Sequence, residues 1–241
     1  MSVFGGPDII TDGLVLHLDA ANRKSYPGSG STWYDLSGQE NSVTISNVVH
    51  SSGNTGKFTF TQNSSSGQIS SPTNDIKSRI VPLTIIAWAR QTTINTYNTI
   101  FGQYGSTTNH QLIKMLRIDS GYMRFFLATS SGGLTLVQHT ERPTLNEWNL
   151  YSVIVTGSAS ATYIQLGLND NFTNVVGMGG SSSNPDTNIK IGIGCRYTNA
   201  NVVGSGDSFS GDISMVSVYN KGLATQEIIK IYNTHKGRYG L

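Results

Sequence analysis

The acidic residues are the first place to look for catalysis, because glycan hydrolysis needs two carboxylates held across one sugar bond, ~5–9.5 Å apart. The chain has four glutamates: Glu40, Glu141, Glu147 and Glu227. None has an acidic neighbour two or four residues away, the spacing that places two carboxylates on one strand face. Asp207 and Asp212 are five residues apart across a Gly-rich turn. The sequence therefore predicts a protein that is not an enzyme, and a glycan hydrolase is the least favoured alternative.

Nucleophilic and metal-dependent catalysis find no better support in the sequence. The chain lacks the Gly-x-Ser-x-Gly elbow of serine hydrolases, and its five histidines lack the spacing of a zinc site. We interpret His17 as a strand residue whose ring nitrogens form hydrogen bonds with neighbouring residues and hold no metal. The single cysteine, Cys195, excludes an internal disulfide and follows an apolar run, so we interpret it as a small core residue.

One tight turn gathers oxygen ligands, because Asp35, Glu40 and Asn41 lie within seven residues. Calcium binds carboxylate, amide and backbone carbonyl oxygens of loops. A calcium site with these three ligands is one interpretation, and no other cofactor is indicated. The interpretation that we favour is an Asx turn, in which Asp35 accepts hydrogen bonds from its own backbone.

Aromatic residues beside Ser-, Thr- and Asn-rich loops are candidates for sugar contact, since a ring offers a platform and the polar side chains offer hydrogen bonds. We name four glycan-binding candidates: Trp33, Tyr34, Tyr104 and Tyr197. The alternative is that these rings anchor the core. Trp33 in particular is flanked by strand-like sequence and is open to that interpretation.

The elements that would position these residues are almost all strands. Alternation with a period of two recurs along the chain, and residues 82–90 are apolar on both faces, as in the central strand of a sandwich. Residues 111–118 and 121–128 flank Asp119-Ser-Gly and predict a hairpin. One helix is expected, at about 224–235. The predicted fold is all-β: a two-sheet antiparallel jelly-roll sandwich with one short C-terminal helix.

Composition narrows the function classes. Charged residues make up 12% of the chain, about half the ~25% typical of soluble domains. The net charge of +2, without a dense Lys/Arg run, predicts no nucleic-acid partner. We expect no signal peptide and no membrane segment, because the first residues lack a basic and apolar leader and the longest apolar run is far below ~20 residues.

Several segments resemble the concanavalin A-like, laminin G-type jelly-roll domains. The segments are 83–89, 147–154, 189–194 and 209–220, followed by 223–232. Within that family the chain is most similar to lectin-like structural proteins of tailed bacteriophages. The runs 13–38 and 236–241 carry this more specific resemblance.

The resemblance implies a virion surface structural protein, a head decoration or a tail or fibre module, made in the host cytoplasm. Its expected partners are other virion proteins, through protein–protein docking, and host cell-surface glycan. Several copies or a homo-oligomer are expected on the virion. A receptor-binding lectin is the alternative function.

The chain is divided into an N-terminal arm, residues 1–12, and a single laminin G-like sandwich, residues 13–241. The arm precedes the first predicted strand and is therefore placed to reach a neighbouring protein. Its apolar residues Phe4, Pro7 and Ile9 are the predicted docking contacts.

Overall fold

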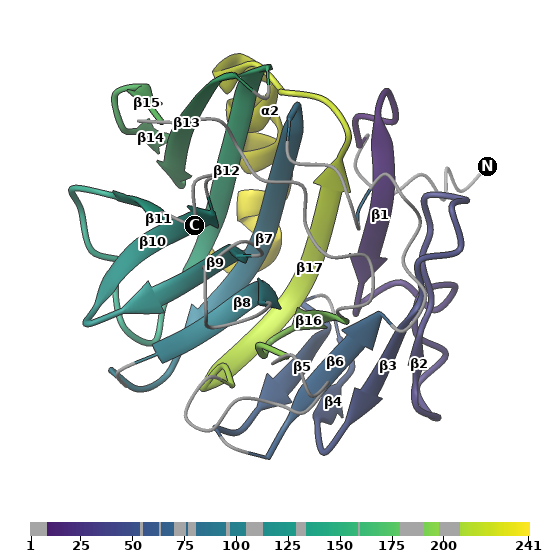
Figure 1. The fold of residues 1–241 in the computed structure, drawn as a ribbon. Coiled ribbons are helices and arrows are strands. Elements are labelled where there is room, and N and C mark those ends of the chain that lie inside the picture. The colour runs from purple at the N-terminus through teal and green to yellow at the C-terminus, as the bar shows by residue number, and fades with distance from the viewer. Residues whose placement is uncertain are drawn as a thin grey trace.

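The structure is a computed structural model. It describes residues 9–53, 55–62, 64–69, 76, 81–94, 97–104, 113–128, 134–158, 160–178, 190–197 and 208–241. Within these ranges two antiparallel sheets face each other, and one short helix lies behind the first sheet (Figure 1). The predicted all-β sandwich is confirmed.

The first sheet, sheet A, has the strand order β14-β13-β12-β7-β17-β5-β4 among the described residues, with β1 paired to β17 and β15 paired to β13. Its strands are β1 (Leu14–Asp19), β4 (Val49–Ser51), β5 (Lys57–Phe60), β7 (Leu83–Gln91), β12 (Trp148–Ser158), β13 (Ala161–Leu168), β14 (Asn171–Phe172), β15 (Val176–Gly177) and β17 (Gly211–Tyr219).

The second sheet, sheet B, has the order β11-β10-β9-β8-β16-β6-β3-β2. Its strands are β2 (Thr32–Trp33), β3 (Val43–Ser46), β6 (Ser66–Ile69), β8 (Tyr97–Tyr104), β9 (Ile113–Asp119), β10 (Tyr122–Ala128), β11 (Leu134–Gln138) and β16 (Ile191–Ile193).

The predicted hairpin is the β9–β10 pair, in which Asp119 lies opposite Tyr122. Only Ser120 and Gly121 remain in the turn, and both have positive φ, 52° and 82°. A two-residue turn with this backbone matches the twist of the flanking strands, which is why a short Gly-containing sequence predicted it.

Alternate residues of the central strands serve two different cores. In β7, Ile85 and Ala87 point into the core between the sheets, while Ile86 and Trp88 point to the outer face of sheet A. That outer face is covered by helix α2 (Thr225–His235) and the 3-10 helix η1 (Lys236–Tyr239). The apolar pattern on both faces of residues 82–90 therefore reflects a sheet buried by sheet B on one side and by the C-terminal helices on the other.

Helix α2 begins where its sequence can satisfy a free backbone donor. Ala224 is the N-cap, and its backbone N–H donates to the Glu227 carboxylate at 2.8 Å. This carboxylate also lies at the positive end of the helix dipole. The helix buries Ile228 and Ile231 against sheet A. The helix ends at His235, as predicted, and the chain continues as η1, which brings Tyr239 to stack on Trp88 with 4.1 Å between ring centroids.

The two ends of the described chain meet on sheet A. Strand β1 pairs antiparallel with β17, with Leu16 opposite Val218. Arg238 then reaches back from η1 to Asp19, at 2.9 Å from Nη1 to Oδ2. No helix among the described residues has the length and apolar character needed to cross a membrane.

Candidate functional site

A row of paired residues runs across the outer face of sheet A. Trp148 of β12 lies opposite Arg90 of β7, Arg90 lies opposite Asp212 of β17, and Asp212 lies opposite Thr59 of β5. Directly opposed residues in a sheet place their side chains on the same face. The ladder therefore gathers an indole, a guanidinium, a carboxylate and a hydroxyl from four strands in one line.

Gly211 lets β17 and β7 approach closely at this row. Its φ is 142°, and a Cβ atom built there would lie 2.1 Å from the carbonyl oxygen of Arg90. Only glycine tolerates that approach without strain. The close contact places Asp212, the next residue, beside the Arg90 side chain.

Asp212 is the centre of the polar cluster, and it is 2% exposed. Its carboxylate accepts hydrogen bonds from Lys57 Nζ at 2.9 Å, Thr59 Oγ1 at 2.6 Å and Arg90 Nε at 2.9 Å. Burial alone would raise the pKa of the Asp212 carboxyl, but the bonds from Thr59, Lys57 and Arg90 outweigh burial and lower that pKa. Asp212 is therefore an ionised structural anchor and is not poised to act as a general acid.

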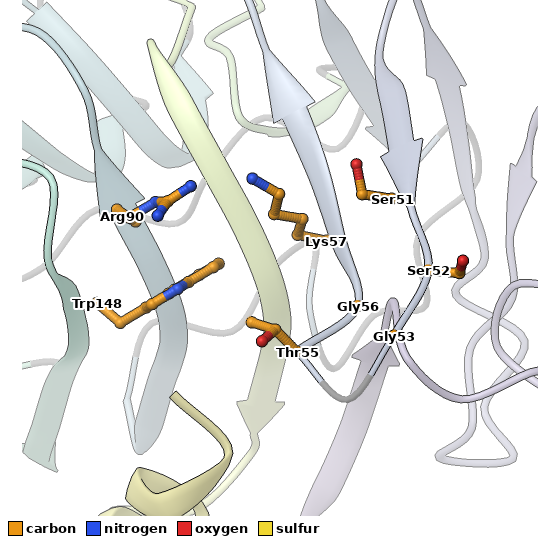
Figure 2. A pocket seen from close by; sticks show the side chains of 8 residues that line it. All are labelled: Ser51, Ser52, Gly53, Thr55, Gly56, Lys57, Arg90 and Trp148. Carbon is orange, nitrogen blue, oxygen red and sulfur yellow. The ribbon is translucent and has the colours of Figure 1, made fainter. Parts of the chain in front are cut away.

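A pocket of about 230 Å³ opens above this cluster. Its walls are Ser51, Ser52, Gly53, Thr55, Gly56, Lys57, Arg90 and Trp148. Figure 2 shows the Lys57 amine and the Arg90 guanidinium pointing toward each other across β17, with Ser51 on the far side of Lys57. The volume is below the ~300–1,000 Å³ of pockets for drug-sized ligands. It therefore suits a ligand smaller than a drug-sized molecule.

Trp148 forms one wall of the pocket. It is 8% exposed, because Tyr239 packs on it with ring centroids 4.9 Å apart and Arg90 lies 5.5 Å from its ring centroid. The indole therefore presents an edge to the pocket and fixes the position of Arg90 by a cation–π contact.

A second pocket, of about 350 Å³, shares Ser52 and Gly53 with the first. The other residues of its lining are Ala20, Ala21, Arg23, Tyr26, Pro27, Gly28 and His50. Tyr26 and His50 pack at 4.6 Å between ring centroids, and His50 Nε2 lies 2.9 Å from the Ala20 carbonyl oxygen. The two pockets therefore meet at Ser52 and Gly53, in the connection from β4 to β5.

A family model described as the concanavalin A-like lectin/glucanases superfamily matches residues 62–229. The chain belongs to this superfamily. The sandwich, the C-terminal helix and the family match agree with one another, and the resemblance drawn from the sequence is confirmed at the level of the superfamily.

Solved structures show the same fold. The chain is similar to the binding domain of botulinum neurotoxin DC in complex with SialylT (14% identity, TM-score 0.65, 93% of this chain and 52% of that chain). It is also similar to domain 4 of AbnA, a GH43 extracellular arabinanase from Geobacillus stearothermophilus, in complex with arabinotriose (12% identity, TM-score 0.66, 91% of this chain and 98% of that chain). A third is the binding domain of Paraclostridial Mosquitocidal Protein 1 (14% identity, TM-score 0.64, 93% of this chain and 53% of that chain).

At these identities the similarity is one of fold. This superfamily member spans about half the length of the toxin binding domains that it matches. The search of curated proteins found no match.

The predicted glycan-binding aromatics do not form one site in the described structure. Trp33 is 0% exposed and packs on Phe58 in the core between the sheets, at 4.8 Å between ring centroids. As a glycan platform Trp33 was therefore a wrong prediction, and the core-anchor alternative is correct. Tyr197 is 5% exposed, whereas Tyr34 is 48% exposed. The side chain of Tyr104, at the end of β8, lies outside the described residues, so Tyr34 and Tyr104 stay predictions.

In the predicted calcium turn, both carboxylate oxygens of Asp35 accept hydrogen bonds from backbone N–H groups. Asp35 Oδ1 accepts from the backbone N–H groups of His17 and Ser37, both at 2.9 Å, and Oδ2 accepts from the Asn41 backbone at 3.0 Å. Glu40 is exposed, and Asn41 donates its side-chain N–H to the Val15 carbonyl at 2.7 Å. Within the described ranges no three His, Cys, Asp or Glu side chains are grouped to hold a metal. This turn is the Asx turn of the favoured interpretation, and a calcium site at Asp35, Glu40 and Asn41 stays a prediction.

Two of the three predicted docking residues, Phe4 and Pro7, lie outside the described residues. Ile9 is partly buried and packs against the apolar cluster on the outer face of sheet A. Asp12 is tied to Lys221 at 2.8 Å. The described end of the predicted arm is therefore packed on its own domain, and Ile9 as a docking contact stays a prediction.

Sequence reasoning missed Lys57, Arg90 and Trp148 as site residues, and it considered Asp212 only as a poor catalytic partner of Asp207. A signal was present, because only 12% of the residues are charged and yet Arg90 stands at the end of the predicted strand 82–90. What the sequence lacked was the strand pairing, since Lys57 and Asp212 are separated by 155 residues.

Proposed function

We propose that this protein is a non-enzymatic, lectin-like carbohydrate-binding domain that holds a saccharide in the pocket of Lys57, Arg90 and Trp148. The observation that carries the proposal is the lining of this pocket, which combines two cationic donors, hydroxyl side chains and the edge of an indole. Sugar recognition uses such a small set of oriented polar groups beside an apolar wall. Two proteins of similar fold are described as complexes with SialylT and arabinotriose, which agrees with this use of the fold.

Binding without cleavage is favoured by the state of the nearest carboxylate. Asp212 lies beneath the pocket and is held by Lys57 and Arg90, and no second carboxylate lines either described pocket. Hydrolysis of a sugar bond would need a second carboxylate across the ligand. We therefore do not propose the glycan hydrolase.

The proposal is tested by blocking the pocket. Ser51→Tyr places a ring where Figure 2 shows the Ser51 side chain beside Lys57, and should abolish retention of saccharides on a glycan array. Val49→Tyr is the matched control, because Val49 lies on the same strand, is 66% exposed and lines neither pocket. Retention that is unchanged by Ser51→Tyr would contradict the proposed site.

We further propose that the domain is displayed on a virion, as a head decoration or a tail or fibre module, in several copies that dock on other virion proteins. The phage-like segments 13–38 and 236–241 support this, and they lie together where Asp19 pairs with Arg238. Here host cell-surface glycan would be the ligand. Gold-labelled antibody should mark purified phage particles, on the head or the tail, and label on no particle would contradict the virion role.

A further inference from the structure

We infer that the pocket selects acidic saccharides, in which a sugar carboxylate is held by Arg90 and Lys57. The inference rests on the proposed function, because it names the ligand class of the same pocket. Three observations carry it: the charge balance of the lining, the hydrogen-bond donors that remain on Arg90, and the direction of the two cationic side chains.

The charge balance leaves the pocket positive. Lys57 and Arg90 contribute two positive charges, and Asp212 beneath them contributes one negative charge, so the cluster carries one excess positive charge. The second pocket adds Arg23, and no Asp or Glu lines either of these described pockets. A concave site of one sign attracts ligands of the opposite sign.

Arg90 keeps an unused edge. A guanidinium has five N–H donors, and Asp212 Oδ2 takes bonds from Nε and Nη2. Among the described residues, the Nη1 group and the second N–H of Nη2 form no other hydrogen bond. These two nitrogens form the edge that grips a carboxylate through two parallel bonds. A carboxylate on a sugar ring therefore fits the remaining donors better than a neutral hydroxyl does.

Lys57 contributes the second donor from the opposite side. One of its three N–H groups is used on Asp212 at 2.9 Å, which leaves two for a ligand. Figure 2 shows its amine facing the guanidinium across β17. The side chains of Lys57 and Arg90 are 24% and 31% exposed, so both are largely shielded and still reachable. Partial shielding strengthens an ionic contact relative to open solvent.

The direct test is calorimetric titration of the full chain with matched ligands. The probes are trigalacturonate, its trimethyl ester and a sulfated galactose trisaccharide. The ester keeps the sugar rings and removes the negative charges. We expect trigalacturonate to bind at least about tenfold more tightly than the ester, because bonds to charged groups are the stronger ones. The preference should shrink as NaCl rises from ~50 to ~500 mM, since salt screens partly exposed charges.

Variants at Ser51 test the charge without replacing any residue of the Asp212 cluster. Ser51 is paired with Lys57 in the β4–β5 ladder, so a glutamate there would neutralise the Lys57 ammonium. Ser51→Gln has nearly the same shape and no charge. We expect Ser51→Glu to bind trigalacturonate about tenfold or more weakly than Ser51→Gln does. Arg142→Gln, which removes a cation that lies over Tyr122 on sheet B, is the control that should leave binding unchanged.

The outcomes separate this inference from the proposed function. Equal binding of the acid and the ester, with equal effects of Ser51→Glu and Ser51→Gln, overturns the inference and leaves a pocket for neutral sugars. Tighter binding of the sulfated trisaccharide than of trigalacturonate overturns the carboxylate assignment and identifies sulfate as the preferred group. Retention of no saccharide by the folded wild-type chain overturns both the inference and the proposed function.

Discussion

At the scale of residues, the outer face of sheet A depends on one carboxylate. Asp212 is the counter-charge for two cations that strand pairing forces together. Without that carboxylate Lys57 and Arg90 would repel each other, and neither would be held in the direction that the pocket requires. The same residue therefore stabilises the sheet and orients the binding groups.

Asp212→Asn should lower the free energy of unfolding by about 2–3 kcal/mol at neutral pH. Removing one partner of a fully buried ion pair costs ~3–5 kcal/mol, and the effect here is smaller because water screens the partly exposed cations. Urea denaturation measures the change. Asp12→Asn, whose partner Lys221 is exposed, should change stability little. Unfolding curves that coincide for wild type and Asp212→Asn would contradict this role.

The residues of the site were hard to predict because side-chain type does not determine burial. Trp33 and Tyr34 are sequence neighbours, yet Trp33 in β2 is fully buried and Tyr34, just past the end of that strand, is 48% exposed. The Asx turn at Asp35 was predictable, because its bonds are local. The pocket cluster was not, because its members come from four strands.

At the scale of elements, two buried histidines, His17 of β1 and His235 at the end of α2, form a polar layer where sheet A meets the C-terminal helices. His17 Nδ1 lies 2.9 Å from Ser217 Oγ of β17. His235 Nδ1 lies 2.8 Å from the Ile231 carbonyl oxygen, one turn earlier in α2. Both rings are buried, at 5% and 3% exposed. The strand-histidine interpretation of His17 is confirmed.

This layer predicts loss of stability in mild acid. Burial lowers the pKa of His17 and of His235, and Asp19 only partly offsets this while Arg238 adds to it. The folded state therefore binds fewer protons than the unfolded state, in which histidine titrates near ~6.5. The two neutral, buried histidines therefore contribute fully to stability above about pH 6.5, and this contribution is lost as the pH falls below that value.

We expect the free energy of unfolding, measured in urea, to fall between about pH 7.5 and 5.5, a window that lies above the ordinary carboxyl pKa values. The His17→Asn, His235→Gln double variant should show a flatter dependence than wild type. A wild-type stability that stays constant or rises over this window would contradict the assignment.

At the scale of the whole molecule, the sandwich is closed by pairing between segments from opposite ends of the described chain. β1 pairs with β17, and Arg238 binds Asp19 across 219 residues. Alternation within each strand predicted most of the strands, the hairpin and the helix, because those signals are local. The assignment of strands to sheets and the covering of sheet A by η1 depend on such long-range contacts, which one sequence does not reveal.

The most direct test of the central claim is a two-dimensional ¹H–¹⁵N spectrum of the indole N–H groups during titration with trigalacturonate. The chain has three tryptophans, and only Trp148 lines the pocket, while Trp33 and Trp88 are 0% exposed. The account predicts that the Trp148 signal shifts in a saturable way and that the Trp33 signal stays in place. Saturable binding that leaves Trp148 unshifted would contradict it and place the ligand elsewhere on the molecule.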